Sequence, residues 1–367
     1  MLKMATKMIE YTISGKGPVI ATRRVVPIPK PGASEVLIKV IATDSNPKDW
    51  KASGGHEEGR GINQGDDISG IVESVGSSVW EFAPGDRVAA FHRMFQPHGS
   101  YAQFAIAPAS TTFKLPPNIS HEAGATLPLA LMTSALALYQ NLGLPLPWNP
   151  ATTETPVLIY GGASAVGAYA IKLAKLSGLS PIITVAGNGI DFVKSLNAAD
   201  FIIDYRKGTV VEDIKAALNG RTLHHAFDAV SYNRSYEDII AVLQASGGGS
   251  IDMVDPPSDD KANPDRESWQ WPEGIKFTRT FVSSAYGSPH KYRDAEGAKQ
   301  DEQFAYAFYR YLSYLLAEGK IEPHPFEVQA DGLESVARGI QLLKDRKVSA
   351  TKLVYRIADT PNLDALD

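Results

Sequence analysis

Residues 157–253 alternate short apolar runs with amphipathic segments, and this alternation constrains the fold more than any other feature of the sequence. The runs PVLIYGG, SPIITVAG, FIIDY, HHAFDAV and GGSIDMV have the composition of buried strands. The stretches between them have helical periodicity, and Gly178 follows the first of these helices. Strands that alternate with helices at this spacing predict an α/β fold with a doubly wound parallel sheet.

The first 120 residues have a different pattern. EVLIKVIAT (35–43) and ISGIVESVG (68–76) alternate apolar and polar positions, and turn sequences such as KPGAS and APGD separate such runs. This pattern predicts a small, irregular β-barrel or sandwich. The apolar stretch 125–147 is interrupted by polar residues, so we expect a buried helix that begins at Pro128. A length of 367 residues favours two domains.

Composition excludes several classes of function. The net charge of -5 gives no electrostatic attraction for nucleic acid or for an anionic membrane. The absence of cysteine excludes disulfides, thiol nucleophiles and cysteine-ligated metal sites, and it fits a reducing compartment. The N-terminal residues lack the apolar core of a signal peptide. We therefore expect a soluble, cytoplasmic protein.

The stretch YGGASAVG (160–167) lies between a predicted strand and a predicted helix. This is the context of a dinucleotide site, in which glycines turn the chain and amides at the helix start face a pyrophosphate. A glycine turn in a doubly wound domain with another ligand, or with none, is the alternative. We expect the pyrophosphate to be bound by Gly162, Ala163, Ser164, Ala165 and Val166, with Gly167 allowing close helix packing.

Several longer segments resemble the zinc-free branch of the medium-chain dehydrogenase/reductase superfamily. NPKDWK (46–51) resembles its NPxDxK segment, and residues 65–88 resemble PGxDxxGxVxxVGxxVxxxxxGDRV. GSYAQFAIA (99–107) is similar to GxYAEYxxV, and residues 116–138 resemble the segment that leads into the nucleotide domain. Within this branch, residues 191–208 and 332–357 resemble fungal trans-acting enoyl reductases, which reduce intermediates held by a polyketide synthase.

The resemblance implies a division into two domains. A GroES-like substrate domain would comprise residues 1–128 and 318–367, and a Rossmann domain binding NADP(H) would comprise residues 129–317. It also implies hydride transfer from NADPH to the activated C=C bond of an enoyl thioester. Hydrogen-bond donors would then stabilise the enolate oxygen.

The cofactor prediction depends on the end of the second predicted strand of the nucleotide domain. An NAD-binding fold usually has an acidic residue there, about 20 residues after the glycines, and this sequence has none. That absence favours NADP(H). The positive partner of a 2′-phosphate is less evident, since Lys194 and Arg206 are both near in sequence and Lys194 could equally be a solvated residue of a helix. The predicted contacts are Ala186, Gly187, Asn188, Gly189, Lys194 and Tyr205.

The remaining site residues follow from the resemblance. Those assigned to the nicotinamide end are Asn46, Pro47, Lys48, Asp49, Met253, Val254, Val348 and Ser349. Those assigned to the substrate are Leu127, Pro128, Leu129, Ala130, Leu131, Met132, Thr133, Ser134, Phe281, Val282, Ser283, Ser284 and Ala285. A buried helix start is the alternative, and a compatible one, for residues 127–134.

The sequence does not identify a catalytic acid. Lys48 could donate to the enolate or to a phosphate, or it could be an exposed loop lysine. Tyr101 is a proton donor by residue type, but it also fits the core of the barrel. His56, in GGHEEG, resembles a zinc ligand, yet the resemblance aligns Gly65-Asp66-Asp67 with the Gly-His-Glu of zinc enzymes. We predict no metal.

Two other functions stay open. The chain could be a zinc-free quinone or alkenal reductase that acts on free small molecules. It could also be a redox-inactive member used for binding or for non-redox chemistry, a possibility raised by the altered AGNG stretch at 186–189. The protein could be a monomer or a homodimer, and a polyketide synthase is a possible partner.

Overall fold

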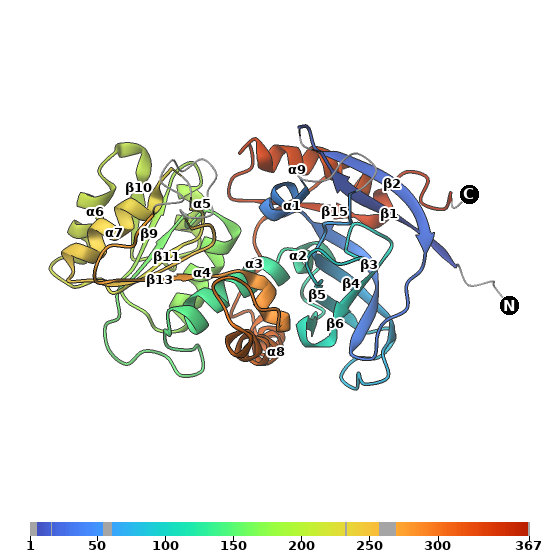
Figure 1. The fold of residues 1–367 in the computed structure, drawn as a ribbon, viewed down its shortest axis with the longest axis horizontal. Coiled ribbons are helices and arrows are strands. Elements are labelled where there is room, and N and C mark those ends of the chain that lie inside the picture. The colour runs from blue at the N-terminus through green and yellow to red at the C-terminus, as the bar shows by residue number, and fades with distance from the viewer. Residues whose placement is uncertain (1–5, 16, 54–60, 232, 257–268, 366–367) are drawn as a thin grey trace. The chain divides into compact units, whose positions relative to one another are not determined.

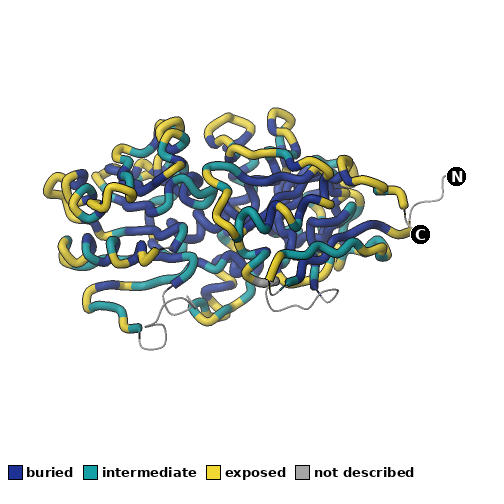
Figure 2. Tube along the Cα trace, turned by 90° about the horizontal axis from the view of Figure 1, so that it is seen from above, coloured by how far each residue is buried: buried dark blue, intermediate teal, exposed yellow. Residues whose placement is uncertain are grey.

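The computed structural model describes residues 6–15, 17–53, 61–231, 233–256 and 269–365. The chain divides into two compact units. The first unit comprises residues 1–129, 283–288 and 295–367, and the second comprises residues 130–282 and 289–294. In both units the strands are largely buried and the connecting turns are exposed (Figure 2). Each unit therefore has its own sheet and its own apolar core.

The second unit contains a six-stranded sheet in the order β10-β9-β8-β11-β12-β13, and all its neighbouring strands are parallel. This order confirms the predicted doubly wound sheet, in which the chain moves outward from β8 in both directions. Figure 1 labels β9, β10, β11 and β13 of this sheet. The strands are β8 (Val157–Tyr160), β9 (Ile182–Ala186), β10 (Phe201–Asp204), β11 (His225–Asp228), β12 (Gly249–Met253) and β13 (Ile275–Arg279).

Helices connect these strands. Apolar residues of α6 and α7 pack in one cluster with the strands, whereas α4 contacts β8 and β9 outside that cluster. The sheet is therefore covered on both faces, as its strands, apolar on both sides, require. The helices are α4 (Ala165–Leu176), α5 (Ile190–Ser195), α6 (Val210–Leu218) and α7 (Ser235–Ala245). α3 (Pro128–Ala135) begins at Pro128 as predicted, is buried, and continues into the π-helical turn η2 (Leu136–Asn141).

The first unit contains a seven-stranded sheet in the order β14-β15-β3-β4-β5-β7, in which β6 also pairs with β3. Only β14 and β15 pair in parallel, and register shifts interrupt the pairing of β3 with β4. This confirms the predicted irregular β-rich domain. The strands are β3 (Glu35–Asp44), β4 (Asp67–Val75), β5 (Arg87–Phe91), β6 (Phe104–Pro108), β7 (Thr112–Lys114), β14 (Phe326–Val328) and β15 (Lys352–Arg356).

A separate two-stranded ribbon and several helices complete the first unit. The ribbon is antiparallel, and the buried side chains of its first strand join the same core as β3, β4 and α9. These elements are β1 (Lys7–Ser14), β2 (Ile20–Pro27), α1 (Pro47–Ser53), α2 (His121–Ala125), α8 (Ala295–Ala317) and α9 (Val336–Lys344).

The division of the chain differs at α8 from the predicted boundaries, which assigned residues up to 317 to the nucleotide domain. α8 groups with the first unit. Tyr309 stacks on Phe113 with ring centroids 5.3 Å apart, and its hydroxyl donates to the carbonyl of Pro128 at 2.9 Å. Arg310 donates to the carbonyls of Ser110 and Ala109 at 2.9 and 3.0 Å. These contacts of Tyr309 and Arg310 hold α8 to the first unit.

Candidate active site

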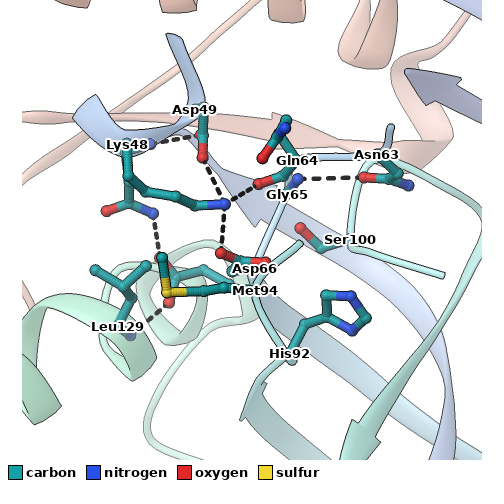
Figure 3. A network of polar contacts seen from close by, with 12 residues as sticks. Lys48, Asp49, Asn63, Gln64, Gly65, Asp66, His92, Met94, Ser100 and Leu129 are labelled. Atoms are coloured by element: carbon teal, nitrogen blue, oxygen red, sulfur yellow. Dashed lines mark hydrogen bonds and ion pairs between the residues drawn. The ribbon is translucent and has the colours of Figure 1, made fainter. Parts of the chain in front are cut away.

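Lys48 is the central cation of a buried polar cluster in the first unit (Figure 3). It lies in the first turn of α1, directly after β3, and its side chain is only 16% exposed. Its ammonium contacts the Asp66 carboxylate, lies 3.1 Å from Asp49 Oδ1, and donates to the carbonyl of Gln64 at 2.5 Å. Lys48 is therefore not an exposed loop lysine, because two ion pairs and one hydrogen bond hold its ammonium.

The protonation of this cluster is set by burial and charge together. Burial raises the pKa of Asp66 to about 7, although Lys48 acts in the opposite direction. Burial opposes the charged form of Lys48, but Asp66 and Asp49 together raise its pKa above the usual value. Asp66 Oδ1 and both amide atoms of Gln64 are buried without a hydrogen-bond partner. The cluster thus combines a stable cation with a carboxyl that titrates near neutrality and with unused polar atoms.

Tyr101 positions Asp49. Its hydroxyl donates to Asp49 Oδ2 at 2.6 Å and lies 3.1 Å from Ser45 Oγ, which lies 2.8 Å from the hydroxyl of Tyr355. Tyr101 is fully buried, and burial and Asp49 raise its pKa well above the usual value. These contacts fit the second reading of the sequence, in which Tyr101 belongs to the barrel core and orders the residues behind Lys48.

A second buried lysine, Lys352 of β15, neutralises the carboxylates beneath this cluster. Its ammonium lies 2.9 Å from Asp44 Oδ2 and 3.8 Å from Asp67 Oδ2, and it donates to Asn46 Oδ1 at 2.9 Å. Asn46 in turn donates to Asp67 Oδ2 at 2.6 Å, and Asp67 Oδ1 accepts the amide of Leu129 at 2.7 Å. Burial raises the pKa of Asp44 well above its usual value, against the effect of Lys352. Asn46 therefore links the two lysine clusters.

In the second unit, the glycine turn has the geometry of an anion cradle. Ser164 caps α4 by accepting the amide of Gly167 at 2.9 Å, which leaves the first-turn amides of Ala165 and Val166 without helical acceptors. A Cβ at Gly167 would lie 2.2 Å from the carbonyl oxygen of Gly161, so only glycine allows this tight approach. The residues present therefore fit a dinucleotide pyrophosphate, for which a helix N-terminus supplies donors and a favourable dipole.

The predicted substrate segment supports this cradle. Ser134 of α3 donates to the carbonyl of Val166 at 2.6 Å, in the first turn of α4. Residues 127–134 are all buried, as expected for a buried helix start. That packing agrees with the structural reading of this segment, and its contact with substrate stays a prediction.

The altered AGNG stretch is explained by Asp204 at the end of β10 and by Tyr205 and Arg206 directly after that strand. A Cβ at Gly187 would lie 2.4 Å from Cε1 of the Tyr205 ring, so glycine is required for the ring to cover the strand end. Arg206 donates to Asn188 Oδ1 at 3.1 Å, and its side chain donates two further hydrogen bonds to Asp204, at 2.7 and 2.6 Å. Asp204 pairs in register with Ala186, so an acidic residue does lie beside this strand end, contributed by the neighbouring strand.

The other predicted residues are divided between the units. Lys194 is exposed and forms an ion pair with Asp191 at 3.0 Å, one turn away on the same helix. Met253 is buried at the end of β12, and Val254 follows it. Phe281 packs against His290, whereas Ser283, Ser284 and Ala285 are buried in the first unit. Val348 is half-buried and Ser349 exposed, also in the first unit. The convergence of both sets on one cleft stays a prediction.

Asp252 is a buried carboxyl beside Met253. It accepts hydrogen bonds from Asn141 at 2.9 Å and from Thr280 at 2.6 Å, and it is fully buried. Burial raises its pKa from 3.8 to about 7, with Thr280 acting in the opposite direction. The folded chain therefore retains this proton over a range of pH in which the unfolded chain has released it.

We expect Asp252→Asn to flatten the pH dependence of stability between about pH 4 and pH 7. The wild-type protein loses stability as pH rises through this window, because folding then keeps a proton that the unfolded chain gives up. The variant has no such proton, so its melting temperature should fall less. Thermal unfolding at a series of pH values measures this, with the exposed residue change Asp191→Asn as the control. Parallel curves for Asp252→Asn and wild type would contradict the prediction.

The described residues do not fit a metal site. They contain no cluster of three or more histidine, aspartate or glutamate side chains placed to hold a metal ion, and the whole chain lacks cysteine. Ammonium groups of Lys48 and Lys352 already neutralise the buried carboxylates Asp66 and Asp67, which align with the Gly-His-Glu of zinc enzymes. His56 lies outside the described residues.

Sequence reasoning missed three contributors to these clusters. The sequence pattern predicts no role for Lys352 or Gln64, and it indicates for Asp66 only the replacement of a metal ligand. A lysine within the apolar run KLVYRI was the available signal for Lys352, because a charged residue in a buried strand requires a partner. No local signal pointed to Gln64.

Comparisons with known proteins place this architecture in a class. Residues 32–117 match the alcohol dehydrogenase GroES-like domain, and residues 165–295 match the family described as zinc-binding dehydrogenase. Among solved structures, a putative zinc-dependent alcohol dehydrogenase from Rhizobium etli superposes with a TM-score of 0.76 at 21% identity, covering 96% of this chain and 98% of that one. The CurK enoyl reductase superposes with a TM-score of 0.71 at 19% identity, covering 96% and 99%. These likenesses define the fold of a medium-chain dehydrogenase/reductase.

Closer relatives specify the family. The chain is 39% identical to the trans-enoyl reductase fsr4 of Gibberella fujikuroi over 82% of this chain and 85% of the relative. It is 33% identical to the trans-enoyl reductase ACTTS2 of Alternaria alternata over 90% and 94%. The chain belongs to the trans-enoyl reductase family within the medium-chain dehydrogenase/reductase superfamily, and it is an oxidoreductase. Across its described residues, no helix has the length and apolarity needed to cross a membrane.

Proposed function

We propose that the protein is a zinc-independent, NADPH-dependent enoyl reductase that acts in trans on an enoyl thioester carried by a polyketide synthase. A bound nicotinamide would supply the hydride for the β-carbon of the enoyl group. The observation that carries the proposal is the Lys48 cluster, since a buried ammonium is suited to stabilising the enolate oxygen that develops in this reaction. Relatives named trans-enoyl reductases support the substrate class and the synthase partner.

Asp66 would control the availability of Lys48. When Asp66 is ionised, Asp66, Asp49 and the Gln64 carbonyl occupy all three N–H groups of Lys48. Protonation of Asp66 weakens the first of these contacts and releases one N–H toward a substrate oxygen. Because burial places the pKa of Asp66 at about 7, this release would occur close to neutral pH.

The direct test uses the purified chain with NADPH. Binding is followed by nicotinamide fluorescence, and turnover by loss of NADPH with an enoyl thioester of pantetheine or with a simple quinone. The proposal expects NADPH binding and faster reduction of the thioester, increased further when the acyl group is attached to the carrier domain of a synthase. Failure to bind NADPH would contradict both reductase readings, and a preference for the quinone would favour the alternative reductase.

Arg206 supports the choice of NADP(H). Its contacts with Asp204 and Asn188 use three of the five guanidinium N–H groups, so one N–H on each terminal nitrogen is available for a phosphate. Both oxygens of Asp204 accept from Arg206, and this ion pair neutralises the carboxylate charge that would otherwise repel a 2′-phosphate. We propose that Arg206 binds the 2′-phosphate, with Asn188 and Tyr205 beside it.

We expect Arg206→Gln to weaken NADPH binding by about 10- to 100-fold, the range for losing charge-assisted hydrogen bonds, and to leave NADH binding unchanged. Fluorescence titration with each cofactor measures both affinities. Lys194→Gln removes the same charge from a side chain already paired with Asp191, so it should change little. The reverse ranking of the two variants would assign the phosphate to Lys194.

A further inference from the structure

Phe95 has a backbone conformation that its residue type disfavours. Its φ is +63°, in the left-handed region, where a bulky side chain is a genuine outlier. The residue is 44% exposed, so burial in the core does not compensate for this conformation. Residues held in this region cluster at functional sites, because the surrounding structure must enforce them. The exposed ring and the disfavoured backbone conformation of Phe95 therefore indicate a function other than packing in the core.

The segment that carries Phe95 is anchored on both sides. Burial lowers the pKa of His92 to about 4, so its imidazole is neutral with one N–H, and its Nδ1 lies 2.6 Å from the carbonyl of Ile106. The amide of Gln96 donates to the carbonyl of Arg93 at 3.2 Å. The amide of Met94 donates to the hydroxyl of Tyr286 at 3.0 Å, within the same unit. His92 and Met94 are drawn with the Lys48 cluster in Figure 3. These contacts fix the residues before and after Phe95, so the ring is presented in one place.

The ring lies beside Lys48, but it does little for that cation. Its centroid is 5.8 Å from Lys48 Nζ, near the limit of about 6 Å for a cation–π contact. Asp66, Asp49 and the Gln64 carbonyl already engage the ammonium. Neither the packing of the ring nor the solvation of Lys48 accounts for Phe95, whose exposed ring stands next to the proposed donor to the substrate oxygen.

We propose that Phe95 is a substrate-contacting residue whose ring supports the conjugated acyl chain of the enoyl thioester while the thioester carbonyl faces Lys48. This inference rests on the proposed function and adds the chemical preference of the site. A flat, conjugated, apolar chain would stack on the ring, and a short acyl group would reach Lys48 without covering it. Phe95 would thus select for chain length and conjugation, and Lys48 would act on the carbonyl of either substrate.

The test compares Phe95→Gly, Phe95→Tyr and Trp80→Ala. Phe95→Gly removes the ring and accepts a positive φ, so we expect an undiminished melting temperature and a KM about tenfold higher for a long conjugated enoyl thioester. Its kcat, and its KM for a short enoyl thioester, should stay near wild type. Phe95→Tyr keeps the ring and should keep both KM values. Trp80 is 82% exposed and lies in another loop of the same unit, so Trp80→Ala should change neither value.

An unchanged KM for the long substrate in Phe95→Gly would overturn the inference, and so would an equal rise for short and long substrates. If the wild-type protein reduces no enoyl thioester, the proposed function fails separately. Binding of the same thioesters, followed by tryptophan fluorescence, then still tests Phe95. Equal affinity of wild type and Phe95→Gly for the long thioester would overturn the role, and a selective loss would support it.

Discussion

Lys48→Met is expected to lower kcat by about 10²- to 10³-fold, the usual effect of removing one donor to a developing oxyanion. NADPH binding should change much less than kcat, because the proposed contacts with the pyrophosphate and the 2′-phosphate belong to the second unit. Steady-state kinetics with an enoyl thioester, together with NADPH titration, measures both quantities. Lys51→Met removes the same charge three residues further along α1, at an exposed position, and should retain activity. A fully active Lys48→Met would refute the assignment.

Asp66→Asn separates charge stabilisation from mere packing at Lys48. In the wild-type protein we expect kcat/KM to fall as pH rises through about 7, because ionised Asp66 then competes with the substrate for a Lys48 N–H. Asparagine mimics the protonated form, so the variant should remain active and lose this step. A purely structural Lys48–Asp66 pair would instead give an unchanged pH profile with lower activity throughout.

Lys352→Met is expected to destabilise the folded chain by about 3–5 kcal/mol, since removing one partner leaves buried charge uncompensated. Asp44 and Asp67 are both fully buried around this ammonium, at 2.9 and 3.8 Å. Urea unfolding monitored by tryptophan fluorescence measures the loss. The exposed residue change Lys347→Met is the control, and its unfolding midpoint should not move.

The double variant Asp44→Asn with Lys352→Met tests the cause of that loss. If uncompensated charge is responsible, removing the carboxylate should restore part of the stability, so the two effects will not add. Additive losses would show that Lys352 acts through packing alone. A Lys352→Met protein that unfolds with wild-type energetics would show that Asp44 is already protonated in the folded state.

Local patterns were sufficient for much of the fold. Strand and helix alternation after residue 156 predicted the doubly wound sheet, because burial on both faces imposes continuous apolar strands. The glycine turn was equally readable, since the conformation of Gly161 (φ +88°) and the close approach at Gly167 exclude most other residues. Both features depend on residues that are neighbours in the sequence.

Predictions that required distant neighbours were less complete. The sequence does not decide whether Lys48 is a hydrogen-bond donor in the site or an exposed lysine. Its burial depends on Asp66 and Gln64, which lie in the segment that leads into β4. The sequence does not decide whether Lys194 or Arg206 contacts the 2′-phosphate. The packing of the Tyr205 ring over Gly187 explains the AGNG stretch, which departs from the family pattern. The resemblance places α8 in the nucleotide domain, whereas the contacts of this helix group it with the first unit.

The sequence by itself determined the parallel sheet, the β-rich unit and the anion site at YGGASAVG. The residue types in each segment depend on its backbone conformation and on which of its faces is exposed to solvent. Only the tertiary structure decided which charges meet. Lys352 reaches Asp44 across more than 300 residues of sequence because β15 pairs with β3. Electrostatic pairing and desolvation depend on distances in space. These distances cannot be read from the order of the residues before the pairing of the strands is known.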